Sequence, residues 1–340
     1  MRPLLEVRDL SLRLPARAER PILDGVSLHV DPGEMVGLVG ESGSGKSVTA
    51  RMVLGLVPDG SQVEGSVRVG DREVVGASRA EILQLRRSEV SMIFQDPRAG
   101  INPIRRVGDF LTESLRLNRK WTAARARAQA VELLRAVGLD DAERHLRQYP
   151  HELSGGMLQR VMIAGALTVE PKLLLCDEPT TALDVTTQAE ILHILKKLQA
   201  EREMGLLFIT HDLDLAAAVC DRVYVMYAGQ IVESAPAVKL FGAPAHPYTA
   251  GLLASTPDLS GGHRRLVPIK GAPLSLLEKP SGCSFTSRCA YALEGVCDAE
   301  VPPLVDGGGD GNGGHAVRCL RSAELGPQLA TLGTGDGSAR

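Results

Sequence analysis

A glycine-rich segment near the start of the chain has the residue types of a phosphate-binding loop. Glycines let successive backbone N–H groups turn toward phosphate oxygens, and the N-terminus of a following helix favours anions. In the pattern G-x-x-x-x-G-K-[ST], the lysine reaches the β- and γ-phosphates of a nucleotide and the last hydroxyl ligates Mg²⁺. A chance glycine-rich turn would lack the strand and helix that this pattern requires on its two sides. The loop and the residue after it are Gly40-Glu41-Ser42-Gly43-Ser44-Gly45-Lys46-Ser47-Val48.

Two adjacent carboxylates, Asp177 and Glu178, follow the apolar run Leu173–Cys176. At the end of a buried strand, one carboxylate can enter the coordination shell of Mg²⁺, and the other can polarise a water molecule for in-line attack on a phosphate. Alone, an acidic strand end is just as often a helix cap or a loop charge. Together with the glycine-rich loop it indicates nucleotide hydrolysis, with Ser47 and Asp177 as metal ligands and Glu178 as the catalytic carboxylate.

The elements that must position these groups are predicted by the apolar pattern, in which strand-like runs alternate with helical ones as far as about residue 235. Continuous apolar runs bounded by turn residues are typical of strands buried on both faces of a parallel sheet. Strands that alternate with helices predict an α/β domain, here over residues 1–235. The expected strands are Leu4–Val7, Ser27–Val30, Met35–Val39, Leu173–Cys176, Leu206–Thr210, Val223–Met226 and Gln230–Ser234.

Between about residues 96 and 169 the pattern becomes helical. Thr122 is placed to cap a helix over Ala123–Val137, and Gly138 ends it. We therefore expect a helical subdomain inserted in the α/β core. A further helix is expected at Thr187–Glu203, with one apolar face.

After residue 235, proline and glycine become frequent. We expect a small extension over residues 236–321, in which Asp306–Gly314 is too polar and too rich in glycine to form a regular element. The last stretch, residues 322–340, is expected to be a disordered tail.

Composition excludes several classes of function. The 340 residues are 44% hydrophobic and 23% charged, which fits a globular chain. The 38 basic and 41 acidic residues give a formal net charge of −3, which argues against a chain built to coat nucleic acid or an anionic membrane. No apolar run approaches the length of a membrane-spanning helix, and charge appears early, so we expect a cytosolic protein without a signal peptide.

Four of the six cysteines lie in the extension, and their context does not suggest a disulfide framework. Four thiolates in a loop-rich segment with little hydrophobic core suit metal binding, although their spacing lacks both the C-x₂-C knuckle of most zinc sites and the ferredoxin patterns. A bound metal is therefore favoured over unpaired thiols, and its identity is left open by the spacing. These residues are Cys283, Cys289, Cys297 and Cys319.

Further motifs give the chain a family resemblance. The segment Leu153–Arg160 (LSGGMLQR) resembles the signature sequence of ATP-binding-cassette (ABC) ATPases, and it precedes the acidic strand as it does in that family. Gln95 matches the family's Q-loop, Ala182-Leu183-Asp184 its D-loop, and His211 its switch histidine. These motifs stand in the family's order and cover about residues 4–235. The resemblance implies a P-loop NTPase core with an inserted helical subdomain.

The resemblance also implies a task for each of these residues. In this family two ATPase domains close head to tail on two ATP molecules, each held between the phosphate loop of one domain and the signature of the other. Gln95 then senses Mg²⁺ and the attacking water, while His211 holds the γ-phosphate and orients Glu178. The residues implied to face the partner domain are Ser154, Gly155, Gly156 and Met157 in the signature and Asp184 in the D-loop.

Two positions depart from the family pattern. Where the family usually places an aromatic ring under adenine, this chain has Leu14, which offers apolar contact without stacking. Met157 stands where the commonest signature has glutamine, although the backbone donors remain. Base recognition is thus expected to be weaker, or to use a ring from elsewhere in the chain.

Within the family, the resemblance narrows to the ATPase subunits of oligopeptide, dipeptide and nickel importers. It rests on Met92–Pro97, Ile101–Pro103, Tyr149–Glu152 and Asp177–Thr186 in the cassette, and on His246–Thr249 after it. The resemblance implies an ATPase that uses ATP and Mg²⁺ to power peptide import from the cytoplasmic face of the membrane. The implied partners are a second ATPase subunit, identical or paralogous, two transmembrane permease subunits and, indirectly, an extracytoplasmic solute-binding protein.

In these importers a similar C-terminal cysteine set is associated with a [4Fe–4S] cluster, so the resemblance favours iron–sulfur ligation by the four cysteines of the extension. Two other functions compete with peptide import. An ABC exporter has the same cassette motifs, but the segment after residue 236 favours import. ABC ATPases that act on nucleic acid or the ribosome usually have two cassettes, a coiled-coil insertion or basic arms. This chain shows one phosphate loop, one signature and near-neutral charge, so no nucleic-acid partner is expected.

Overall fold

The structure is a computed structural model that describes residues 2–15, 21–181, 183–256, 267–275, 278, 280–306 and 314–334. Three sequence-based expectations fall wholly or partly outside these residues: the first residue of the D-loop, Ala182, most of the segment 306–314, and the end of the chain after residue 334.

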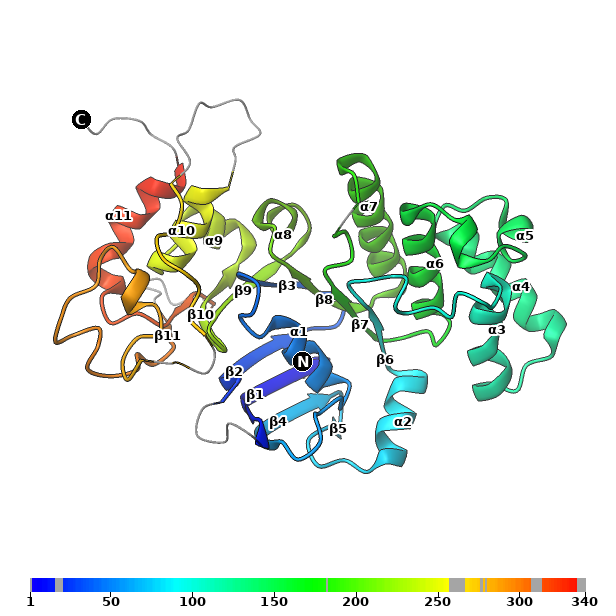
Figure 1. Cartoon of the computed structure of the whole chain (residues 1–340), viewed down its shortest axis with the longest axis horizontal. Helices are drawn as coiled ribbons and strands as arrows, with labels where there is room; N and C mark the ends of the chain where they lie inside the picture. Colours follow the sequence, from blue (N-terminus) through cyan, green and yellow to red (C-terminus); the bar gives the residue numbers. More distant parts are fainter. Residues whose placement is uncertain are drawn as a thin grey trace.

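The central element is a sheet with the strand order β11-β12-β10-β9-β3-β8-β7-β6 among the described residues (Figure 1). Five neighbouring strands from β9 to β6 run parallel, and β10 pairs antiparallel with β9. Every residue of β3, β7 and β8 is buried, which confirms the mostly parallel α/β sheet expected from the continuous apolar runs. The strands are β3 (Met35–Val39), β6 (Val90–Ile93), β7 (Leu173–Asp177), β8 (Gly205–Thr210), β9 (Arg222–Tyr227), β10 (Gln230–Pro236), β11 (Val305–Asp306) and β12 (Ala316–Val317).

A second, antiparallel sheet packs beside the first. Its order is β2-β1-β4-β5, formed by β1 (Leu5–Arg13), β2 (Leu23–Val30), β4 (Gln62–Val69) and β5 (Arg72–Glu73). The inward residues of β1 and β2 share one apolar core with α1 (Lys46–Val53), which follows the phosphate loop. This core holds α1 beside the antiparallel sheet, near the middle of the molecule in Figure 1.

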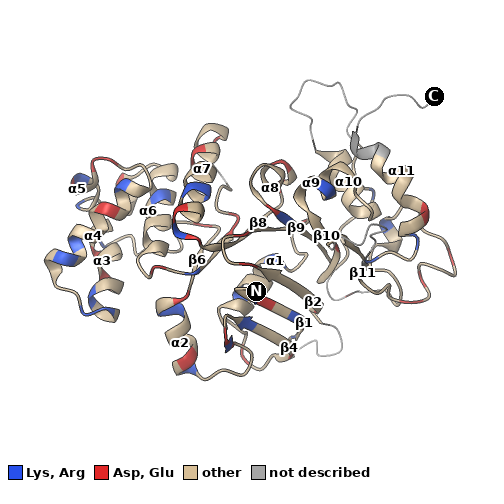
Figure 2. Ribbon diagram, turned by 180° about the vertical axis from the view of Figure 1, so that it is seen from behind, with Lys and Arg blue, Asp and Glu red and all other residues tan. Residues whose placement is uncertain are grey.

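The helical insertion forms a separate group at one end of the molecule (Figure 1). Within it, α4 begins after its Thr122 cap and matches the expected helix to within one residue. Basic and acidic side chains are interspersed over these helices (Figure 2), as the small net charge suggests. The insertion comprises α3 (Val107–Asn118), α4 (Ala123–Ala136), α5 (Ala142–His145), the short 3₁₀ helix η2 (Pro150–Glu152) and α6 (Gly155–Leu167).

The remaining helices flank the sheets and build the extension. The predicted helix after the acidic strand is α7 (Val185–Arg202), whose apolar residues Ile191, Ile194, Leu195 and Leu198 are buried as expected. None of the helices in the described part of the chain is long and apolar enough to cross a membrane. The others are α2 (Arg79–Ser88), α8 (Leu213–Val219), α9 (Ala237–Gly242), α10 (Pro247–Ser255), the 3₁₀ helix η3 (Thr286–Arg288) and α11 (Ser322–Thr334).

The expectation of a disordered tail over residues 322–340 is wrong for its first part, because Ser322–Thr334 forms α11. Leu325 and Leu329 lie one helical turn apart and are only 2% and 0% exposed. They pack with Ala250 of α10 and with Tyr291. Tertiary burial of one apolar face therefore orders a segment whose composition alone suggests disorder.

Candidate nucleotide site

The phosphate loop lies between β3 and α1 with a backbone that only glycine adopts easily. Gly40, Gly43 and Gly45 have φ values of 148°, 80° and 110°. A Cβ atom at Gly40 would lie 2.2 Å from the carbonyl oxygen of Met226. The glycines in the sequence pattern are thus required by the fold as well as by the phosphate contacts they predict.

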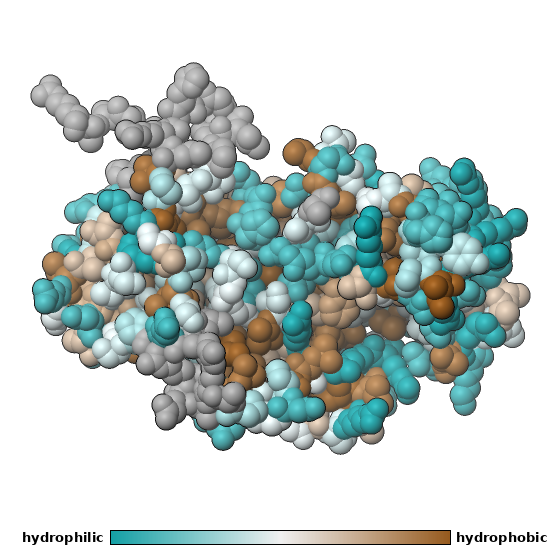
Figure 3. Space-filling model, viewed as in Figure 1, coloured by the Kyte–Doolittle hydropathy of each residue, from teal (hydrophilic) through white to brown (hydrophobic). Residues whose placement is uncertain are grey.

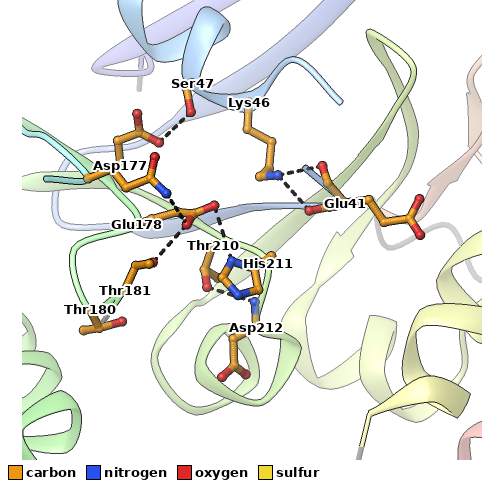
Figure 4. Close-up of polar contacts among 12 residues, drawn as sticks. Glu41, Lys46, Ser47, Asp177, Glu178, Thr180, Thr181, Thr210, His211 and Asp212 are labelled. Atoms are coloured by element: carbon orange, nitrogen blue, oxygen red, sulfur yellow. Dashed lines mark hydrogen bonds and ion pairs between the residues drawn. The ribbon is translucent and has the colours of Figure 1, made fainter. Parts of the chain in front are cut away.

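Lys46 is buried at the start of α1 and points back into the loop (Figure 4). Its Nζ donates hydrogen bonds to the carbonyl oxygens of Gly40 at 2.7 Å and Glu41 at 2.9 Å. Burial lowers the pKa of Lys46, and the nearby carboxylates of Glu178 and Asp177 oppose that effect. An anion entering the loop would meet a desolvated ammonium group that is held in position by backbone oxygens.

Ser47 and Asp177 are joined across the site, from α1 to the end of β7 (Figure 4). The Ser47 hydroxyl donates to Asp177 Oδ1 at 2.8 Å. Burial raises the pKa of Asp177, and the hydrogen bond from Ser47 partly offsets the rise. A hydroxyl and a carboxylate in this position match the oxygen ligands that Mg²⁺ prefers.

Glu178 joins three motifs that are far apart in the sequence. Its Oε2 accepts hydrogen bonds from Gln95 Nε2 and Thr181 Oγ1, both at 2.9 Å. Its Oε1 lies 3.3 Å from His211 Nδ1. Since Gln95, Glu178 and His211 follow β6, β7 and β8, the parallel sheet brings them to one edge. We call this set, with Ser47 and Asp177, the strand-end cluster.

The backbone of Glu178 is unusual and held in place. It has a left-handed φ of 46°, and its N–H donates to the carbonyl oxygen of Ile209 at 3.0 Å. A non-glycine residue in this conformation costs free energy and persists when its surroundings fix it. Two features that hold Glu178 were not predicted from the sequence. They are the hydrogen bond from Thr181 and the turn after β8. In that turn, Thr210 Oγ1 accepts from the N–H of Asp212 at 2.9 Å.

The signature residues lie elsewhere, at the start of α6. Ser154 caps this helix, since its Oγ accepts from the N–H of Met157 at 3.3 Å. Asp184 caps the neighbouring helix α7 through the N–H and hydroxyl of Thr187, and these hydrogen bonds lower the pKa of Asp184. A Cβ at Gly156 would touch Thr187 Cγ2 at 2.5 Å, and one at Gly155 would lie 3.7 Å from Leu183 Cδ2.

The signature therefore lies beside the D-loop and away from the phosphate loop of the same chain. Among the described residues, no hydrogen bond joins residues 154–157 to residues 40–47. Leu14, expected near adenine, follows β1 and is half-buried.

The four cysteines of the extension come together around one pocket, which is also lined by His246 and Phe285. All four are free thiols in this structure. Burial raises the pKa of Cys283 and Cys319, and that of Cys289 to about 11. No three of the four sulfur atoms lie within 4.8 Å of one another. A tetrahedral zinc site with Zn–S bonds of about 2.3 Å would hold its sulfurs closer than that.

The fold and the site together define a P-loop ATPase, with a triphosphate cradle on one sheet edge and a separate signature surface. Two family descriptions match the sequence: "ABC transporter" over residues 23–181 and "Oligopeptide/dipeptide transporter, C-terminal region" over residues 232–297. The chain belongs to the ABC transporter ATPases, in the group of oligopeptide transport ATP-binding proteins. This confirms the family resemblance of the sequence motifs and the ATP-hydrolysing class of the protein.

Similar proteins of known sequence span nearly the whole chain. The oligopeptide transport ATP-binding protein AppD of Bacillus subtilis is 44% identical over 96% of this chain and 99% of its own length. OppD of Haemophilus influenzae is 42% identical over 95% and 99%. Among solved structures, CbiO1 of Clostridium perfringens, part of the ABC transporter complex CbiONQ, aligns with a TM-score of 0.63 and 27% identity over 71% of this chain and 91% of its own.

A second solved structure has the same fold. The ABC cassette MJ0796, in a dimeric post-hydrolysis state bound to ADP and phosphate, has a TM-score of 0.60 and 28% identity over 68% of this chain and 98% of its own.

Proposed function

We propose that this chain hydrolyses ATP at the cytoplasmic face of a membrane to drive peptide import through a separate permease. The observation that carries the proposal is the combination of the strand-end cluster with a C-terminal region of the oligopeptide-transporter type. A cassette alone does not give the direction of transport, and the extension after β10 is what favours import over export.

Each residue of the cluster has a role in the proposed reaction. Lys46 and the loop amides bind the β- and γ-phosphates, and Ser47, Asp177 and Gln95 hold Mg²⁺. The metal, when bound, supplies positive charge that neutralises the phosphate oxygens.

Glu178 orients the attacking water and accepts its hydrogen bond, in a position set by Gln95, Thr181 and His211. His211 also contacts the γ-phosphate. When a second subunit closes over the bound nucleotide and excludes bulk water, these polar contacts become stronger.

The second half of the site comes from another subunit in this proposal. Ser154, Gly155 and Gly156 lie at the N-terminus of α6, where backbone N–H groups and the helix dipole favour an anion. In the described chain this anion-binding end has no phosphate loop beside it. A second ATPase subunit, identical or paralogous, would place its γ-phosphate there, with Met157 and Asp184 in the same interface.

Docking on the two permease subunits is proposed for the helical insertion, near Ile101–Phe110. Ile104 is 81% exposed there, on a subdomain whose surface is otherwise mostly hydrophilic (Figure 3). Leu117 of the same subdomain is 71% exposed, and single apolar residues are common on protein surfaces, so this docking site rests on the family resemblance. The extracytoplasmic solute-binding protein acts through the permease and makes no contact with this chain.

The four cysteines are proposed to ligate a [4Fe–4S] cluster. All four line one pocket, and their sulfurs are more widely spaced than a single zinc ion requires. The N–H of Leu293 donates to Cys297 Sγ at 3.5 Å, a contact that stabilises a bound thiolate. Iron and acid-labile sulfide analysis of anaerobically purified protein should give four of each per chain, and a Cys289→Ser variant should lose them. Zinc in their place would contradict the cluster.

Uptake of a labelled peptide tests the transport function. Cells that depend on this ATPase should accumulate the peptide with the wild-type chain and fail to do so with Lys46→Ala. Accumulation that is unchanged by this substitution would contradict the proposal. Faster efflux with the wild-type chain would indicate an exporter instead.

A further inference from the structure

The extension reaches the phosphate loop through Glu41, the second residue of the glycine-rich pattern. Three groups of Glu41 have partners. Its carbonyl oxygen accepts from Lys46 Nζ at 2.9 Å, its N–H donates to the hydroxyl of Tyr248 at 2.9 Å, and its carboxylate is bound by Arg288. Tyr248 and Arg288 both belong to the extension, and they follow Glu41 by 207 and 247 residues.

The contact between Arg288 and Glu41 is a two-pronged ion pair. Arg288 Nη1 and Nη2 donate to the two carboxylate oxygens at 2.6 and 3.0 Å. Paired hydrogen bonds of this kind fix orientation as well as distance. The arginine side chain is only 4% exposed, so the pair is little screened by water.

Arg288 itself is rigidly placed. Its guanidinium lies over the rings of Tyr227 and Phe285, at 5.8 and 6.0 Å from their centres. Its Nε donates to the carbonyl oxygen of Lys270 at 3.1 Å. These contacts hold the Arg288 side chain in one position beside the phosphate loop.

Arg288 belongs to the segment of the extension that contains the cysteines. Arg288 ends the 3₁₀ helix η3, directly before Cys289, and this helix lies between Cys283 and Cys289. The N–H of Cys283 donates to the carbonyl of Cys297 at 2.8 Å, and the N–H of Thr286 to that of Cys283 at 3.1 Å. The residue that holds Glu41 is therefore part of the same hydrogen-bonded loop as Cys283 and Cys289.

We propose that Arg288 is a positioning residue of the nucleotide site, which couples the cysteine pocket of the extension to the phosphate loop through Glu41. Loss of order around the cysteines weakens nucleotide binding, and bound nucleotide in turn protects the cysteines, because coupling between two sites is reciprocal. The inference rests on the assignment of the loop as the nucleotide site. It holds whichever group the four thiols bind.

The test compares variants of the full chain at the two ends of the ion pair. Arg288→Gln and Glu41→Gln should each weaken the binding of Mg-ATP about tenfold, and the double variant no further. Arg288→Lys should recover only part of the affinity, since a single ammonium cannot make both contacts. The control is Arg222→Gln, because Arg222 also forms a partly buried ion pair, with Glu34 at 3.0 Å, but lines neither the cysteine pocket nor the phosphate loop. It should bind Mg-ATP within about twofold of wild type.

A second readout follows the rate at which Cys289 becomes open to alkylation by iodoacetamide in the protein as purified, through opening of the pocket and release of any bound group. Saturating Mg-ATP should slow the alkylation of Cys289 about tenfold in the wild type and leave its rate unchanged in Glu41→Gln. If Arg288→Gln does not fold, the Glu41→Gln variant alone decides the test, because the Glu41 carboxylate is partly exposed. Wild-type affinity and protection in Glu41→Gln, or an equal loss of affinity in Arg222→Gln, would overturn the inference. Failure of the wild type to bind Mg-ATP would instead overturn the proposed function.

Discussion

The two functional surfaces of the cassette differ in how complete they are within one chain. In the strand-end cluster, Glu178 already contacts Gln95, Thr181 and His211, and Ser47 contacts Asp177. In the signature, Ser154 is engaged only in capping its own helix among the contacts of the described residues. One surface is assembled by the parallel sheet, and the other presents a helix N-terminus outward.

If the proposed function holds, this difference makes hydrolysis depend on assembly without any rearrangement of the core. In that proposal a single chain binds Mg-ATP, and the second set of phosphate contacts comes from a facing subunit. Substitutions in the strand-end cluster should therefore change binding or chemistry in one chain, and substitutions in the signature should change turnover alone.

The largest effect is expected for Glu178→Gln. Removing the carboxylate that orients water should lower the ATPase rate by about 10²–10⁴-fold, while Mg-ATP binding is retained. Steady-state phosphate release and equilibrium ATP binding measure the two quantities. Undiminished hydrolysis would remove Glu178 from its catalytic role.

Asp177→Asn should weaken Mg-ATP binding by at least about tenfold, since a metal ligand loses its charge. Burial raises the pKa of Asp177, so its ionised form is penalised in the folded state at neutral pH. Without Mg²⁺, the variant should therefore have a higher free energy of unfolding at pH 7. This gain should shrink as the pH falls through the raised pKa of the folded protein and should be absent below about 4, where the wild-type carboxyl is neutral in both states. Denaturant melts across this range check the sign, and a variant less stable at pH 7 would contradict it.

Ser154→Ala tests the signature, with Thr122→Ala as its matched control. Each residue caps one helix of the helical insertion through a hydrogen bond of 3.3 Å. Each substitution should cost about 1 kcal/mol of stability. Only Ser154→Ala should also lower the turnover of the assembled transporter, by about tenfold, because it removes a donor to a charged phosphate. Equal turnover in the two variants would mean that Ser154 of the signature takes no part in catalysis.

The smallest effect is expected for Leu14→Tyr. If Leu14 lies under adenine, a ring there adds stacking of about 0.5–1.5 kcal/mol and should tighten ATP binding about two- to tenfold. Leu14→Met is the control for size, and titration with a fluorescent ATP analogue measures both. A tyrosine variant that binds like the methionine variant would place the base elsewhere.

Much of the fold could be predicted because burial and sequence pattern coincide. The strands β3, β7 and β8 are continuous apolar runs, and each is buried along its whole length. By contrast, β4 was not predicted. It is a half-exposed strand of the antiparallel sheet with polar residues and Gly65 in its middle, so its pairing with β1 gives no strong local signal.

The same reasoning separates the predicted and unpredicted parts of the site. Motif spacing predicts the phosphate loop and Glu178, because their chemistry requires those residue types beside a buried strand, and the family resemblance adds His211. The contact between Arg288 and Glu41 joins residues 247 positions apart through side chains that match no pattern. Likewise, α11 is ordered by two leucines that pack on α10 and Tyr291, which only the tertiary structure reveals.

The most direct test of the account is retention of labelled ATP by the purified chain, with and without Mg²⁺, for the wild type and Lys46→Ala. The account predicts Mg²⁺-dependent retention by the wild type that is largely lost in the variant, since the buried ammonium at the loop is the main charge facing the phosphates. No retention by the wild type, or equal retention by both proteins, would contradict it.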